Sequence, residues 1–114
     1  MDSKTTIDEL KGLVAKFVKD RDWEKYHNPK DLATAISIEA AELLELFLWE
    51  NQVPVALGGD LAADAREELA DLVIYCLSFA NAQGWDISDA VREKVLKNEK
   101  KYPVSRYRGV ARVG

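Results

Sequence analysis

Two stretches decide how this chain folds: residues 35–49, AISIEAAELLELFLW, and residues 67–77, EELADLVIYCL. Each carries two acids spaced three apart, Glu39 with Glu42 in the first and Glu68 with Asp71 in the second. Residues three apart on a helix share a face, so each pair presents two carboxylates in one direction. Buried carboxylates are costly and repel one another unless protons, basic side chains or a metal ion compensate. If the two helices pair antiparallel, a divalent cation is the natural counter-charge for the four acids.

The donor types on these stretches favour Mg²⁺ or Mn²⁺. Oxygen-only ligand sets suit these hard ions, whereas zinc sites usually draw on Cys or His, and the chain has only one of each. Di-iron carboxylate bundles place a His three residues after a Glu, and neither pair has one. Protein-bound Mg²⁺ usually shares phosphate oxygens with a substrate, which points toward phosphoanhydride chemistry. The alternative is that the acids are solvated and merely separate apolar stripes.

Two neighbouring acids lie beside these pairs. Glu45 continues the row of Glu39 and Glu42 by another three residues, so it is a candidate addition to the site. Glu67 lies off the face of Glu68, and we expect it to point to solvent.

The composition indicates a single globular domain over residues 1–114. The chain has a mass of 12.8 kDa with 47% hydrophobic and 32% charged residues, a balance typical of folded proteins. The amino terminus lacks an apolar signal-peptide core, and no run reaches the roughly 20 apolar residues that cross a bilayer, so we expect a cytoplasmic protein with no membrane partner. Cys76 is the only cysteine, and its apolar neighbours predict a packed, unreactive thiol.

Charge is distributed unevenly along the chain. The net charge is −4, but residues 92–112 hold eight Lys/Arg against two Glu, a net +6, which leaves −10 on the rest. An acidic body is a poor match for duplex phosphate, so stable nucleic-acid binding is not expected. The basic end is suited to a small polyphosphate, although a solvated basic terminus is the simpler interpretation.

The spacing of apolar residues predicts four helices and no strand, an all-α fold. Capping residues and breakers place them after Thr6, from Pro29 to about Glu50, from about Leu61 to Ala82, and from Ile87 to just before Pro103. A loop is expected over residues 51–60 and an extended tail over 104–114. The second helix is apolar on more than one face, which predicts that the protein forms a homo-oligomer.

Beyond these patterns, the chain resembles the MazG-like group of all-α nucleoside triphosphate pyrophosphohydrolases, in particular its dCTP pyrophosphatase branch. The resemblance runs from about Leu10 to Pro103 and rests on E-x-x-E, a spacer of 25 residues, and E-x-x-D. Further shared features are Arg21-Asp22-Trp23 with His27 and Pro29, the run from Glu42 to Trp49, and Lys94-x-x-x-Asn98-x-x-Lys101-Tyr102-Pro103.

The resemblance implies a Mg²⁺-dependent hydrolase, with Mn²⁺ as the other candidate ion, that cuts a nucleoside triphosphate into a monophosphate and pyrophosphate. Glu39, Glu42, Glu68 and Asp71 match the metal-binding positions, and Glu39 or Glu42 is expected to act as the catalytic base. The matched substrate-contacting positions are Trp23 and Trp49 for the base and Lys94, Asn98, Lys101 and Tyr102 for the phosphates. The resemblance also implies a homotetramer built from two dimers.

Other residues have competing interpretations. Tyr75 follows Asp71 by one helical turn, so it can contact the deoxyribose or be a buried structural residue. His27 is expected either to pack at a helix entry or to contact the base, and Trp85 is expected to be structural. Val14 stands where a relative can place a polar base-contacting residue, which leaves the preferred base open.

Two alternative functions stay open. The first is a pyrophosphohydrolase for dUTP or another noncanonical nucleotide, and the second is a non-catalytic helical interaction module.

Overall fold

The computed structural model describes residues 1–111, and within them the chain is helical with no strand. The elements are α1 (Ile7–Asp20), the short 3₁₀ helix η1 (Glu24–Tyr26), α2 (Pro29–Glu45), α3 (Gly59–Gln83), α4 (Ile87–Lys101) and α5 (Val104–Tyr107). By their contacts they form two compact units, Met1–Gly84 and Trp85–Gly114. The expected all-α class is confirmed, while the single domain stays a prediction.

Four of the predicted helix boundaries are confirmed by their capping groups. The Glu9 N–H donates to the Thr6 hydroxyl at 3.1 Å and the Asp31 N–H donates to the Asn28 side-chain oxygen at 2.9 Å, which start α1 and α2. Asp86 starts α4 in the same way, accepting from the Asp89 N–H at 2.8 Å. Gly84 ends α3 with a φ of 71°, a left-handed conformation in which glycine has no side-chain penalty.

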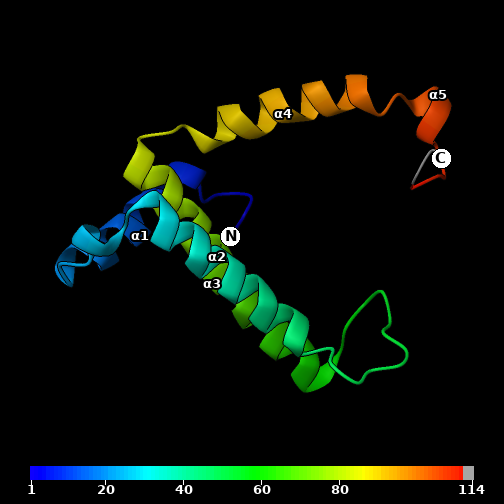
Figure 1. The fold of residues 1–114 in the computed structure, drawn as a ribbon, viewed down its shortest axis with the longest axis horizontal. Helices are drawn as coiled ribbons and strands as arrows, with labels where there is room; N and C mark the ends of the chain where they lie inside the picture. Colours follow the sequence, from blue (N-terminus) through cyan, green and yellow to red (C-terminus); the bar gives the residue numbers. More distant parts are fainter. Residues whose placement is uncertain (112–114) are drawn as a thin grey trace. The chain divides into compact units, whose positions relative to one another are not determined.

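The first unit is built on α3. Helix α2 runs antiparallel beside it, and α1 packs against it as well (Figure 1). The buried apolar residues come from all three helices: Val14, Val18, Leu32, Ala65, Leu77 and Ala80. A hydrogen bond adds to this packing, because the Asn81 side-chain amide donates to the Lys11 carbonyl oxygen at 3.0 Å. The antiparallel arrangement of α2 and α3 is the one expected to bring the two acidic pairs together.

The second helix is shorter than the sequence predicts. It ends at Glu45 rather than near Glu50, and residues 46–49 form turns. The Phe47 and Leu48 N–H groups bond to carbonyl oxygens three residues back, at 3.0 and 3.1 Å, as in a tightened last turn. Trp49 then takes a φ of 70°, which ends the right-handed path. Apolar side chains continue through this turn, so their spacing alone overestimated the helix.

Two smaller expectations were wrong. The tail was expected to be extended, but Val104–Tyr107 forms a helical turn after Pro103, and the Tyr102 and Tyr107 rings meet edge to face at 5.1 Å. The remainder of the predicted tail, residues 112–114, lies outside the described residues. Cys76 is exposed rather than packed, because it shares an exposed face of α3 with Leu69 and Val73, at four- and three-residue spacings.

No described helix has the length and apolar character needed to cross a membrane.

Candidate metal centre and adjoining cavities

Three of the four predicted acids converge between α2 and α3. One carboxylate oxygen from each of Glu39, Glu42 and Glu68 lies within 4.8 Å of the other two. Glu39 and Glu42 are one turn apart on α2, and Glu68 faces them from α3 because the two helices run antiparallel. The three side chains can therefore share one small cation.

Two of these carboxylates are in surroundings that penalise their charge. Glu39 Oε2 and Glu68 Oε2 are buried, and neither has a hydrogen-bond partner among the described residues. Loss of solvation raises the pKa of Glu39 above its usual value, with further contributions from Glu42 and from the charges of Asp71 and Glu68. Loss of solvation likewise raises the pKa of Glu68, followed by the effect of Glu42. A divalent cation would relieve both the lost solvation and the repulsion.

The other acids are less closely involved. Asp71 lies outside the group of three, although its charge is near enough to raise the pKa of both Glu39 and Glu68. Its role as a fourth ligand stays a prediction. Glu67 is exposed, as expected. Glu45 is exposed at the end of α2 and is not among the three converging acids.

A small cavity, with lining residues one helical turn from the acids on α2 and α3, holds three of the predicted substrate-binding residues, Trp23, His27 and Tyr75. Its volume is about 210 Å³, and it is also lined by Tyr26, Asp31, Leu32 and Ala35. Ala35 lies one turn before Glu39 on α2, and Tyr75 lies one turn after Asp71 on α3. Since the helices are antiparallel, both residues are displaced toward the same end of the bundle. Tyr26 and Asp31 were not expected here, because their sequence context indicated only a charged turn and a helix start.

Trp49 does not lie with Trp23 in this chain. Trp23 is half-exposed and meets Phe17 edge to face at 5.8 Å, whereas Trp49 is 89% exposed in the turn after α2. The positive φ of Trp49 is unfavourable for a bulky residue, and the exposure of its indole to water is unfavourable as well. Such strain is found where function or assembly requires it. The residues described thus form only one side of the expected aromatic pair.

The predicted phosphate-contacting residues all lie on or next to α4. Lys94, Asn98 and Lys101 fall four and three residues apart, so they share one face of this helix. Tyr102 follows as the residue that ends α4, and the Lys101 ammonium lies 5.3 Å from the centre of its ring. These residues belong to the second compact unit and form a basic cluster by themselves.

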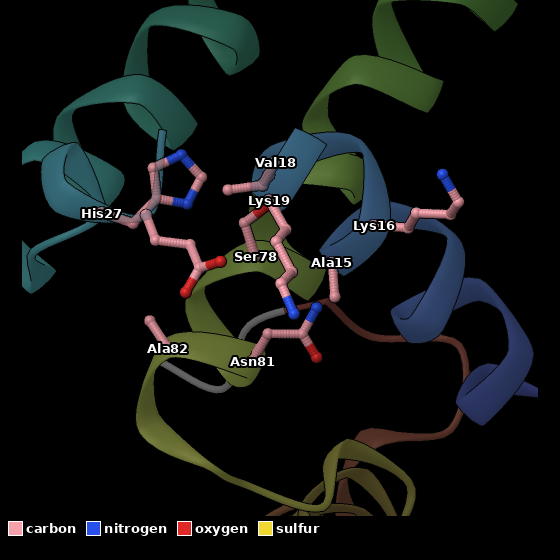
Figure 2. A pocket seen from close by; sticks show the side chains of 9 residues that line it. Ala15, Lys16, Val18, Lys19, His27, Ser78, Asn81 and Ala82 are labelled. Carbon is pink, nitrogen blue, oxygen red and sulfur yellow. The ribbon is translucent and has the colours of Figure 1, made fainter. Parts of the chain in front are cut away.

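A larger cavity was not predicted from the sequence. It has a volume of about 510 Å³ and lies between α1, the η1 region and the end of α3 (Figure 2). Its lining is mixed in chemistry: Ala15, Lys16, Val18, Lys19, Glu24, His27, Ser78, Asn81 and Ala82. One signal was available, since Ser78 and Ala82 continue the face of α3 that begins with Asp71 and Tyr75.

Comparison with known proteins identifies the family. The MazG-like family model matches residues 34–112. Curated relatives named dCTP pyrophosphatase 1 are 38% identical in Bos taurus, over 96% of this chain and 66% of the relative, and 34% identical in Homo sapiens, over 94% and 65%. The chain thus spans slightly less than two thirds of their length. A solved pyrophosphatase from Archaeoglobus fulgidus is 38% identical, with a TM-score of 0.71 over 84% of this chain and 91% of that one.

The family match covers both acidic pairs and the basic residues of α4, which are the features the sequence singled out. The chain therefore belongs to the MazG-like family.

Proposed function

We propose that this protein is a cytoplasmic, Mg²⁺-dependent nucleoside triphosphate pyrophosphohydrolase. Its substrate is dCTP or a modified dCTP, which it cuts to the monophosphate and pyrophosphate. The observation that carries the proposal is the convergence of Glu39, Glu42 and Glu68, with two buried oxygens that lack partners in the described part of the chain, one helical turn from an aromatic cavity. The names of the dCTP pyrophosphatase relatives support this substrate class.

The residues at the centre fit a hard divalent cation. Glu39 and Glu68 each contribute a buried oxygen that has no hydrogen-bond partner within residues 1–111, and Glu42 lies within reach of both. Asp71 is the proposed fourth ligand, since its charge acts on the same site. Bound Mg²⁺, or Mn²⁺ in its place, supplies Lewis-acid stabilisation of phosphate charge. The carboxylates hold it and set where the triphosphate is positioned.

A carboxylate in this cluster also has to accept the proton of the attacking water. Glu42 is exposed, whereas Glu39 has a buried oxygen suited to a ligand, so Glu42 is the favoured base with Glu39 as the alternative. The proton passes to a Glu42 carboxylate oxygen as the water attacks phosphorus and the pyrophosphate group leaves.

The remaining groups are proposed to bind the rest of the nucleotide. Trp23 stacks on the base, Tyr75 lies beside the deoxyribose, and Lys94, Asn98, Lys101 and Tyr102 bind phosphate oxygens. Trp49 reaches the base from another copy of the chain in a homo-oligomer, which we propose to be a tetramer. Its 89% exposure in one chain supports this assignment.

Pyrophosphate release from a panel of dCTP, 5-methyl-dCTP, dUTP and dATP, with Mg²⁺ or with EDTA, tests the proposal. We expect Mg²⁺-dependent release that is fastest with the cytosine nucleotides. Preferred hydrolysis of dUTP would assign the activity to a different pyrimidine. Release of orthophosphate alone would contradict the cleavage site, and no turnover of any nucleotide would favour a non-catalytic helical interaction module.

A further inference from the structure

His27 lines both of the cavities described above, and the two linings have no other residue in common. Figure 2 shows the imidazole ring at the edge of the larger cavity, across from the residues of α1 and α3. The same side chain lies with Trp23 and Tyr75 around the smaller one. His27 therefore separates the two spaces.

The order of residues along α3 shows which of the two cavities lies nearer the acidic cluster. Asp71, Tyr75, Ser78 and Ala82 are four, three and four residues apart, so they follow one face of the helix. Tyr75 lines the small cavity, while Ser78 and Ala82 line the large one. At about 1.5 Å per residue, a ligand that extends away from the metal centre meets the small cavity, then His27, then the large cavity.

The backbone holds His27 in this position from both sides. Its N–H donates to the Glu24 carbonyl oxygen at 3.0 Å and thereby ends η1. The next residue, Asn28, caps α2 through its side chain. A residue held between two helix ends has little freedom to move its backbone, so the point from which its side chain projects between the two cavities is fixed.

The volumes of the two cavities indicate which size of nucleobase the site can hold. The small cavity, at about 210 Å³, is below the roughly 300–1,000 Å³ of usual ligand sites, whereas the large one is about 510 Å³. With the phosphates at the metal centre, the base enters the small cavity with its far edge toward His27. A purine joins the sugar through its five-membered ring, so its six-membered ring reaches further from the sugar than a pyrimidine does.

We propose that His27 is the wall that restricts the bound base to a single ring, and that the cavity behind it is the space a purine would enter if this wall were removed. The inference rests on the proposed function and adds the residue that sets base size. It differs from recognition of the base by a hydrogen bond from the imidazole, because it requires only the bulk of the side chain.

Three changes at one position separate bulk from hydrogen bonding. His27→Ala joins the two cavities, and His27→Asn shortens the side chain while keeping a residue suited to a helix end. His27→Phe keeps the ring without its nitrogens. The matched control adds Ala82→Phe to His27→Ala, because Ala82 is exposed at the large cavity and a ring there refills the space.

The measurement is kcat/KM for dATP and for dCTP, from pyrophosphate release with Mg²⁺, together with circular dichroism of each variant. Wild type should favour dCTP. His27→Ala and His27→Asn should lower the dCTP/dATP ratio at least about tenfold through a rise in kcat/KM for dATP, a change that unfolding cannot produce. His27→Phe should keep the preference, and Ala82→Phe should restore it in the His27→Ala background.

Three results would overturn the inference: a wild type that accepts both nucleotides equally, an unchanged ratio in folded His27→Ala and His27→Asn, or a loss of preference in His27→Phe equal to that in His27→Ala. The wild-type rates separate this failure from that of the proposed function. Turnover of dCTP with an unchanged ratio in the variants rejects the wall alone, whereas no turnover of either nucleotide rejects both.

Discussion

The two compact units differ in how they are stabilised and in their charge. Every buried residue in the described chain belongs to the first unit, whereas residues 85–111 contain none. Residues 1–84 carry eight Lys/Arg against sixteen Asp/Glu, a net −8, while residues 85–114 carry eight against four, a net +4. One unit thus provides a core and the acids, and the other provides basic groups on a helix without a core of its own.

This difference has a physical basis. Carboxylates that share one cation must be held in place against their own repulsion, and the packed pair α2 and α3 supplies that rigidity. Lysines that bind an outer phosphate act as point charges on flexible side chains and need less exact placement. The second unit, however, leaves the apolar side chains of Val91, Val95 and Leu96 about half exposed or more.

The largest expected effect concerns the acids of the first unit. Glu39→Gln or Glu68→Gln should lower kcat/KM for dCTP by at least about 1,000-fold, more than 4 kcal/mol, because each removes the charge of a proposed cation ligand. Without Mg²⁺ the thermal midpoint of these variants should equal or exceed that of wild type, since an uncharged amide avoids the loss of charge solvation, and then the repulsion, that raise the pKa of these acids.

Glu67→Gln is the matched control, because Glu67 is adjacent in sequence but exposed. It should retain most of the activity. An equal loss in Glu67→Gln and Glu68→Gln would show that overall negative charge, rather than the cluster, supports turnover.

The sequence predicted the convergence of three of the four acids because its signals were local. Spacings of three residues, capping groups at Thr6, Asn28 and Asp86, and a glycine at position 84 each act within one or two helical turns. These signals set which faces of α2 and α3 meet, and the convergence of Glu39, Glu42 and Glu68 follows.

Properties that depend on packing between distant parts of the chain were harder to predict from the sequence. The end of α2 was placed five residues too far, because apolar residues 46–49 read equally well as helix or as an exposed turn. Exposure of Cys76 depends on which face of α3 its neighbours leave uncovered. The large cavity joins residues from α1, η1 and α3, and helical periodicity indicates only the part that α3 contributes, not how the three elements pack together.

The second prediction concerns the apolar residues of α4. If another copy covers them, dilution should lower activity and helicity together, and Val95→Glu should shift the protein toward monomers by placing a charge in the contact. Sedimentation velocity measures the assembly state, and Glu93→Gln, at an exposed polar position of the same helix, is the control. A wild-type protein that is monomeric and fully active at nanomolar concentration would contradict the oligomer.

A smaller effect is expected for the tryptophans. Trp23→Ala should weaken dCTP binding by about 1–3 kcal/mol, roughly 5- to 150-fold, while leaving pyrophosphate binding nearly unchanged, because pyrophosphate has no ring to stack. Trp49→Ala should act in the same way if a second copy delivers this indole. Isothermal titration with both ligands measures the difference, and Trp85→Ala is the comparison. Equal losses for dCTP and pyrophosphate would indicate packing roles instead.

The smallest effect is expected in the second unit. Lys94→Ala should raise KM for dCTP by up to about tenfold, because an exposed ion pair contributes about 1 kcal/mol or less and a better-desolvated one somewhat more. The loss should shrink as salt is added, since screening already weakens the wild-type contact. Lys100→Ala is the control, because Lys100 lies on a different face of α4 from Lys94, Asn98 and Lys101. If both variants lose affinity equally, the basic unit acts through its net charge and the proposed phosphate-binding face is wrong. If only Lys94→Ala loses affinity, Lys94 makes a defined contact with the substrate, even though α4 has no buried core.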